Sequence, residues 1–89
     1  MAMIKVSPAE LRDLASRIQG YANEVVSLSS AISNSFASGT ENFEGNTKNR
    51  FDQRFEEMEP IISRQLPDLL TEFAEELIKA ATRFEELDG

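Results

Sequence analysis

The sequence predicts an all-α protein, an antiparallel helical hairpin that dimerises into a four-helix bundle. Two long segments carry apolar residues at intervals of three and four, which is the spacing of one face of an α-helix. A short segment rich in Gly and Asn separates them, so the two helices must run antiparallel. The apolar stripes are wider than a single hairpin can cover, which indicates that a second hairpin packs against the first.

The chain has 89 residues, which corresponds to a single domain over residues 1–89. A domain this small has a thin core and needs disulfides, a metal or a partner chain. The absence of both Cys and His excludes disulfides, thiolate metal sites and imidazole-based catalysis. Association with another chain is therefore the expected source of stability. The net charge of -7 argues against nucleic acid and anionic membranes as partners.

The first helix is expected at about residues 8–37. Ser7 is a typical helix cap, Pro8 suits the first helical position, and Glu10 completes a capping box. Seven apolar residues follow with a period of 3.5, which is typical of a left-handed helix pair: Leu11, Leu14, Ile18, Tyr21, Val25, Leu28 and Ile32. Small residues beside this stripe would let a second backbone come close, although the serines are equally explained as solvent-facing. Gly20 is interpreted as a further sign of close packing.

The turn is expected at about residues 38–46, where two Gly, two Asn and a Thr form a loop by composition. The second helix is expected at about residues 47–87. Its apolar stripe has a period of 3.6 and consists of Phe51, Phe55, Met58, Ile62, Leu66, Leu69, Phe73, Leu77, Ala80, Phe84 and Leu87. Pro60 and Pro67 each remove a helical hydrogen bond, but the stripe keeps its phase across both. A kinked helix is expected, with Pro67 favoured over Pro60 as the break.

Ten residues of these stripes are expected to hold the seams of the hairpin and of its dimer. They are Leu14, Ile18, Tyr21, Val25, Leu28, Phe55, Met58, Ile62, Leu69 and Phe73. Covering several hundred Å² of apolar surface at roughly 25 cal/mol per Å² is comparable to the whole stability of a small domain. The predicted partner is a second copy, and the alternative is another protein with a matching apolar face.

The turn resembles the signature of the WXG-type family, the early-secreted-antigen-like (Esx-like) small substrates of type VII secretion systems. Phe43-Glu44-Gly45 stands where that family has Trp-X-Gly. Residues 1–12 and 51–60 are also similar to the family, and the resemblance covers most of the chain. Independently of the family, Gly45 is expected to adopt a backbone conformation that a Cβ disfavours. The ring of Phe43 is expected to seal the open end of the hairpin.

The resemblance implies a protein that acts by protein–protein interaction, without catalytic residues, cofactors or metals. It implies export as a folded helical dimer by a signal-peptide-independent route, from the cytoplasm and through the secretion ATPase, and a role in bacterial virulence or competition. The family's export signal adds a C-terminal aromatic-X-X-X-acid segment to the turn motif. Phe84 and Asp88 match that segment, with Phe in place of Tyr. Apolar runs of at most four residues argue against membrane insertion.

Two alternative functions stay open at this point. The first is a dedicated chaperone or adaptor that heterodimerises with the helical N-terminal domain of a larger secreted toxin. The second is a cytosolic helical adaptor that is not exported. The acidic residues within 52–59 could in principle serve acid–base chemistry or bind calcium, but their spacing places them on the solvated face of the second helix.

Overall fold

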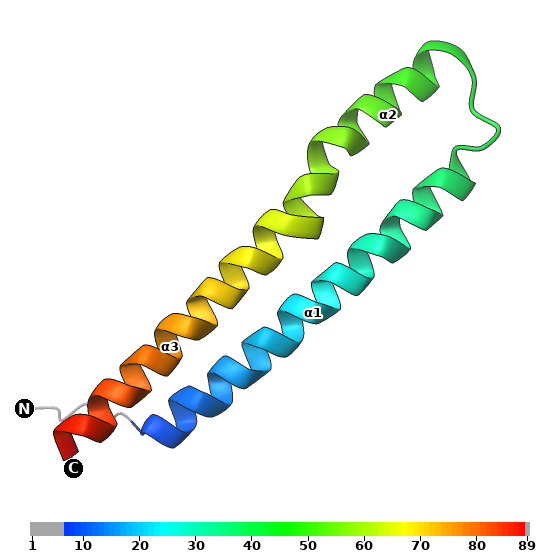
Figure 1. Cartoon of the computed structure of the whole chain (residues 1–89). Helices are drawn as coiled ribbons and strands as arrows, with labels where there is room; N and C mark the ends of the chain where they lie inside the picture. Colours follow the sequence, from blue (N-terminus) through cyan, green and yellow to red (C-terminus); the bar gives the residue numbers. More distant parts are fainter. Residues whose placement is uncertain (1–6, 89) are drawn as a thin grey trace, which may run out of the picture.

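The computed structural model describes residues 7–88, and every regular element within that range is a helix. Helix α1 spans Pro8–Gly39, and α2 spans Gly45–Pro60. The five-residue π-helical segment η1, Ile61–Gln65, joins α2 to α3, Leu66–Asp88. The first arm of the hairpin is α1, and the second arm, α2–η1–α3, returns beside it in the opposite direction (Figure 1). The predicted all-α antiparallel hairpin is therefore confirmed.

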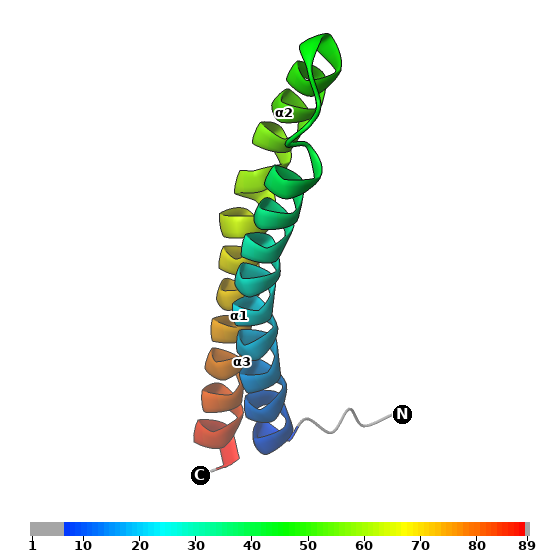
Figure 2. The same cartoon turned by 90° about the vertical axis from the view of Figure 1, so that its right-hand side faces the viewer.

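The hairpin is a thin rod. It measures 65 × 22 × 19 Å, and its radius of gyration is 19.9 Å, whereas a compact chain of this length has about 12 Å. The start of α1 and the end of α3 lie at one end of the rod, and the turn lies at the other (Figures 1 and 2). A rod of two helices leaves much of each helix without a neighbour.

The start of α1 follows the expected capping chemistry. The Glu10 N–H donates to Ser7 Oγ at 3.3 Å, and the Leu11 N–H donates to the Ser7 carbonyl at 3.0 Å. Pro8 occupies the first helical turn, where its missing N–H costs no hydrogen bond. Residues 1–6, which are half of the family-like opening, lie outside the described residues.

A row of small side chains forms the seam between α1 and α3. Ala15, Ala74 and Ala81 are fully buried. The other buried positions of the two helices are Ile18, Ala22, Ser29 and Pro67. Small side chains let two helical backbones approach closely, as expected for Ala15 and Ala22, but Ala31 is exposed. The solvent-facing interpretation is wrong for the buried Ser29, whereas other serines of α1 are exposed as that interpretation expects: Ser27, Ser30 and Ser35. Larger side chains pack at the edges of this seam, namely Leu70, Leu77 and Ile78.

Most of the residues expected in the seams do not lie between the two arms. Ile18 is buried, and Val25, Phe55 and Ile62 are half-buried. The other six are at least 40% exposed: Leu14, Tyr21, Leu28, Met58, Leu69 and Phe73. None of these six is therefore buried in the hairpin seam, because the helices turn them to a neighbouring face or, for Leu28, toward an open groove between the arms. Their place in a seam between two hairpins stays a prediction.

Gly20 does not mark close packing within the hairpin. It is exposed, and a Cβ built at this position would meet nothing within 4 Å. Close packing of Gly20 against another chain stays a prediction.

The second arm is continuous, and its irregular segment lies before Pro67 instead of at it. In η1 the Leu66 N–H donates to the Ile61 carbonyl, five residues earlier. Pro67 is buried near the start of α3. The expectation that Pro67 is the favoured break is wrong, because a wider helical turn accommodates the missing donors without ending the helix.

The extra residue in the η1 turn changes which side of the second arm faces α1. The buried residues of α3 are Pro67, Ala74 and Ala81, which lie seven residues apart. If the second arm were a regular α-helix, the same interval continued into α2 would turn Gln53 toward α1. One additional residue rotates a helix by about 100°. Phe55 and Ile62 are accordingly half-buried, whereas Gln53 is exposed. The π-helical turn thus brings Phe55 of α2 toward α1, whereas Phe51 and Met58 stay exposed.

Candidate interaction surface

An apolar strip, here named the open face, runs along one side of the hairpin. From α1 it includes Leu14, Tyr21 and Leu28, which are 40%, 52% and 59% exposed and recur every seven residues. From α3 it includes five more exposed apolar residues: Leu66, Leu69, Phe73, Phe84 and Leu87. Exposed apolar patches of this continuity are typical of surfaces that bind another protein.

Helical geometry places both sets of residues on the same side of the seam. Tyr21 comes one residue before the buried Ala22, and Phe73 comes one residue before the buried Ala74. One residue corresponds to about 100° of rotation. Because α1 and α3 are antiparallel, a step of one residue toward the N-terminus leads to the same side of the hairpin in both helices. The two apolar lines therefore form one surface.

The opposite side of the seam carries polar contacts between the arms. An Arg12 Nη2 donates to Glu85 Oε1 at 2.5 Å and to Thr82 Oγ1 at 3.1 Å. The hydrogen bond from Arg12 stabilises the carboxylate and lowers the pKa of Glu85 below its ordinary value. The hairpin thus has a polar side that joins its own two arms and an apolar side that has no partner within the described chain.

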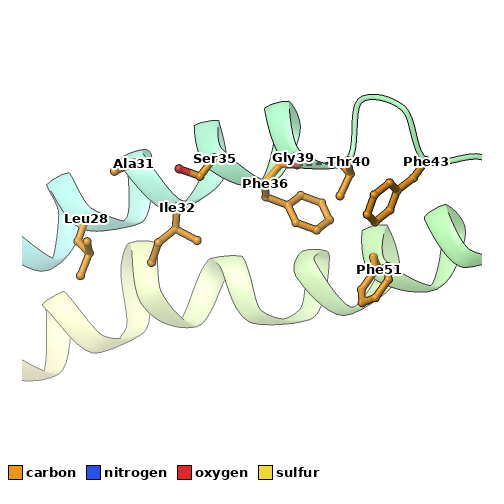
Figure 3. A pocket seen from close by; sticks show the side chains of 9 residues that line it. All are labelled: Leu28, Ala31, Ile32, Ser35, Phe36, Gly39, Thr40, Phe43 and Phe51. Atoms are coloured by element: carbon orange, nitrogen blue, oxygen red, sulfur yellow. Dashed lines mark hydrogen bonds between the residues drawn. The ribbon is translucent and has the colours of Figure 1, made fainter.

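Toward the turn, the open face leads into a shallow apolar groove between the arms (Figure 3). The groove has a volume of about 600 Å³ and is lined by Leu28, Ala31, Ile32, Ser35, Phe36, Gly39, Thr40, Phe43 and Phe51. Figure 3 shows Leu28, Ile32 and Phe36 pointing from α1 toward the second arm. Leu28 belongs to both the groove and the open face, so the two surfaces are continuous.

The turn motif Phe43-Glu44-Gly45 leads directly into α2. Gly45 has a φ of +74°, which confirms the expectation of a conformation that side chains with a Cβ disfavour. The ring of Phe43 lies against Phe51, with 6.0 Å between the ring centroids, but it is 40% exposed. The expectation that Phe43 seals the end of the hairpin is wrong, because the groove beside it stays open.

Thr40 organises the turn, although its role was not apparent in the sequence. The Thr40 hydroxyl donates to the Phe36 carbonyl at 2.7 Å, and the Phe43 N–H donates to the Thr40 carbonyl at 3.0 Å. Thr40 is only 7% exposed. The Gly39-Thr40 pair, in which a glycine follows the apolar stripe of the first helix, is the sequence signal that could have identified this C-terminal cap.

The C-terminal half of the candidate export signal lies at the far end of the rod from the turn motif. Phe84 is 37% exposed and belongs to the open face. Asp88 is the last residue of α3, and its side chain lies outside the described part of the chain. The two halves of the signal therefore occupy opposite ends of one hairpin, and their role in export stays a prediction.

The described residues offer no other obvious chemistry. Among residues 7–88 there is no group of three or more Asp or Glu side chains arranged to hold a metal ion. None of the described helices is both long and apolar enough to cross a membrane. The open face and its groove are accordingly the principal candidate site.

Comparisons with known proteins agree on the family of this hairpin. The chain is 31% identical over 89 residues to an ESAT-6-like protein of Streptococcus agalactiae serotype V, covering 100% of this chain and 92% of the relative. The crystal structure of EsxA from Geobacillus thermodenitrificans superimposes with a TM-score of 0.81 at 26% identity, covering 97% of this chain and 92% of that one. The family model described as proteins of 100 residues with WXG matches residues 3–89. This protein therefore belongs to the WXG100 family.

Proposed function

We propose that this protein is a small type VII secretion substrate that forms a dimer through its open face and is exported as a folded helical bundle. The observation that carries this proposal is the continuous apolar surface along α1 and α3, which the hairpin itself leaves exposed. Membership of the WXG100 family supports the secretion role. The protein acts by binding other proteins, and the secretion ATPase is the expected receptor of its export signal.

The accessible surface of the chain supports a partner of its own size. The chain exposes 7117 Å², whereas a compact monomer of about 10 kDa exposes roughly 5,200 Å². The difference is about 1,900 Å², and a standard protein–protein interface covers about 800 Å² on each partner. This excess is more than twice the area that such an interface covers on one partner, so the chain has ample surface for a second hairpin on the open face, and the pair would form a four-helix core.

Analytical ultracentrifugation of the purified chain tests the dimer. We expect twice the chain mass for the natural sequence and a monomer for Phe73→Asp, because a carboxylate would be placed in an apolar interface. Thr71→Asp is the matched control, since it adds the same charge to an exposed position of α3 two residues away. Circular dichroism should show both variants to be helical. A natural chain that stays a compact, cooperatively melting monomer at high concentration would overturn the proposal.

Export is tested separately in bacteria that express the protein with and without the secretion ATPase. We expect the protein in the culture supernatant only when the ATPase is present, and reduced export after Phe84→Ala. Retention in the cytoplasm of both strains would favour a cytosolic adaptor. Recovery exclusively in complex with a larger secreted protein would favour the chaperone.

A further inference from the structure

We propose that η1 is a hinge and that α2 is a mobile arm, which swings between the open position observed here and a closed position against the end of α1. The inference does not require a dimer, because it concerns one arm of one hairpin. It rests on the poor anchoring of α2, on the hydrogen bonds missing around η1 and on the groove that separates α2 from α1.

The first observation is that little holds α2 in place. None of its residues is buried, whereas Ala74 and Ala81 of α3 are fully buried. Helix α1 packs along α3 and diverges from α2 (Figure 1). Buried apolar contact is the main force that fixes a helix to its neighbour. Helix α3 is therefore fixed to α1, whereas α2 is only loosely attached.

Two pairs of aromatic rings connect α2 to α1 and to the turn. Phe55 stacks on Phe36 of α1 with 4.5 Å between the ring centroids, near the base of the arm. At the tip, Phe51 lies against Phe43 of the turn and is still 49% exposed. Phe55 lies on the η1 side of the middle of α2, so a small swing about η1 displaces it less than the tip, while the tip contact belongs to the turn and can move with it.

The second observation is that the helix is weakest where the arm begins. Pro60 and Pro67 each lack an N–H, and the turn between them is π-helical. Two missing donors within eight residues remove hydrogen bonds that would otherwise keep the helix straight. Kinks in helices concentrate at prolines and at π-helical turns. Pro60 before η1 and Pro67 after it thus mark the two ends of the proposed hinge.

The third observation is that a closed position is available. The groove between the arms is lined by apolar side chains from α1, from the turn and from Phe51 of α2. Movement of α2 toward α1 would fill this groove with the arm's own apolar side and bury surface that is now exposed. The open and closed positions therefore differ in apolar burial, at the cost of bending η1.

Spin labels on an otherwise cysteine-free chain test the hinge. One pair, at Ala37→Cys and Gln53→Cys, reports on the α1–α2 distance, and a control pair, at Gln19→Cys and Glu75→Cys, reports on the α1–α3 distance. All four positions are exposed. Labelled chains are diluted with unlabelled chains, so that pulsed electron paramagnetic resonance measures only distances within one hairpin. We expect a broad or two-peaked distribution for the first pair and a narrow one for the second.

Two further measurements locate the motion. Hydrogen exchange should be at least about tenfold faster for the amides of α2 than for those in the middle of α3. Pro60→Ala restores one donor and should narrow the α1–α2 distribution. A distribution as narrow as that of the control pair overturns the proposal, even if the amides of α2 exchange fast, since α2 would then fray in place. A broad distribution that Pro60→Ala leaves unchanged also overturns it, because the motion would lie outside η1.

Discussion

At the scale of single residues, glycine has opposite consequences at two positions of this hairpin. Gly20 lies in the middle of α1, exposed and with open space where a Cβ would stand. There it only increases the conformational entropy of the unfolded chain. Gly45 starts α2 with a φ of +74°, where any other residue would be strained. Gly20 is therefore dispensable for the fold of the hairpin, whereas Gly45 is required by the positive φ of the backbone at the start of α2.

Gly20→Ala should therefore stabilise the protein by about 1 kcal/mol. Gly45→Ala should destabilise it by about 1–2 kcal/mol, which is the cost of a left-handed backbone conformation for a residue with a Cβ. Urea unfolding followed by circular dichroism measures both changes on the same scale. A destabilising Gly20→Ala would show that another chain packs closely at this position.

The Arg12–Glu85 pair predicts a titration that can be followed directly. Its hydrogen bond lowers the pKa of Glu85 from the ordinary value of 4.5. The pair therefore contributes stability that is present above the ordinary glutamate pKa and is lost as the pH falls through the lowered one. In an NMR titration of the Glu85 side-chain carboxyl carbon, Arg12→Met should raise the midpoint toward the ordinary value. An unchanged midpoint would mean that the pair does not persist in solution.

At the scale of whole helices, the sequence predicts the existence of the elements better than their rotation. The start of α1 can be predicted from the sequence because Ser7, Pro8 and Glu10 act locally. The residues of the seam are harder to predict. Close packing of two helices requires small residues such as Ala74, whereas apolar periodicity is most evident in large residues such as Phe73. A single period of 3.5 or 3.6 cannot distinguish a face that meets the other arm from a face that stays open.

The π-helical turn could not be placed from the sequence for a related reason. Two prolines indicate a weak region, but the compensating change is one extra residue that rotates α2 relative to α3. Its benefit depends on a contact between distant residues, the stack of Phe36 on Phe55. Local propensity contains no information about that contact, which arises only when the two arms are side by side.

Deletion of Arg64, an exposed residue of η1, should convert the π-helical turn into an ordinary α-helical one. The loss of one residue would rotate α2 by about 100°, turn Phe55 away from Phe36 and lower the stability of the protein. Loss of the nuclear Overhauser contacts between the two rings would report the rotation. Arg64→Ala is the matched control, because it removes the same side chain and keeps the residue count. Retention of the ring contacts after the deletion would show that η1 does not set the rotation.

At the scale of the whole molecule, apolar attraction and charge repulsion oppose each other. The open face favours association, but every copy carries a net charge of -7. Like charges on two rods repel over a Debye length of about 30 Å at 0.01 M salt and only about 3 Å at 1 M. The balance between the two forces therefore depends on ionic strength, whereas the hairpin itself, held by its alanine seam, should be much less sensitive to it.

We therefore expect the dimer to become tighter as salt rises from about 0.01 M to about 1 M, because screening removes repulsion and salt does not weaken apolar contact. Sedimentation equilibrium at several salt concentrations measures the dissociation constant. Glu72→Gln combined with Glu76→Gln, at two exposed positions of α3, should tighten the dimer at low salt and reduce the salt dependence. Should the dimer instead weaken as salt is added, ion pairs between the two chains would have to hold it, and the open face would not be the principal interface.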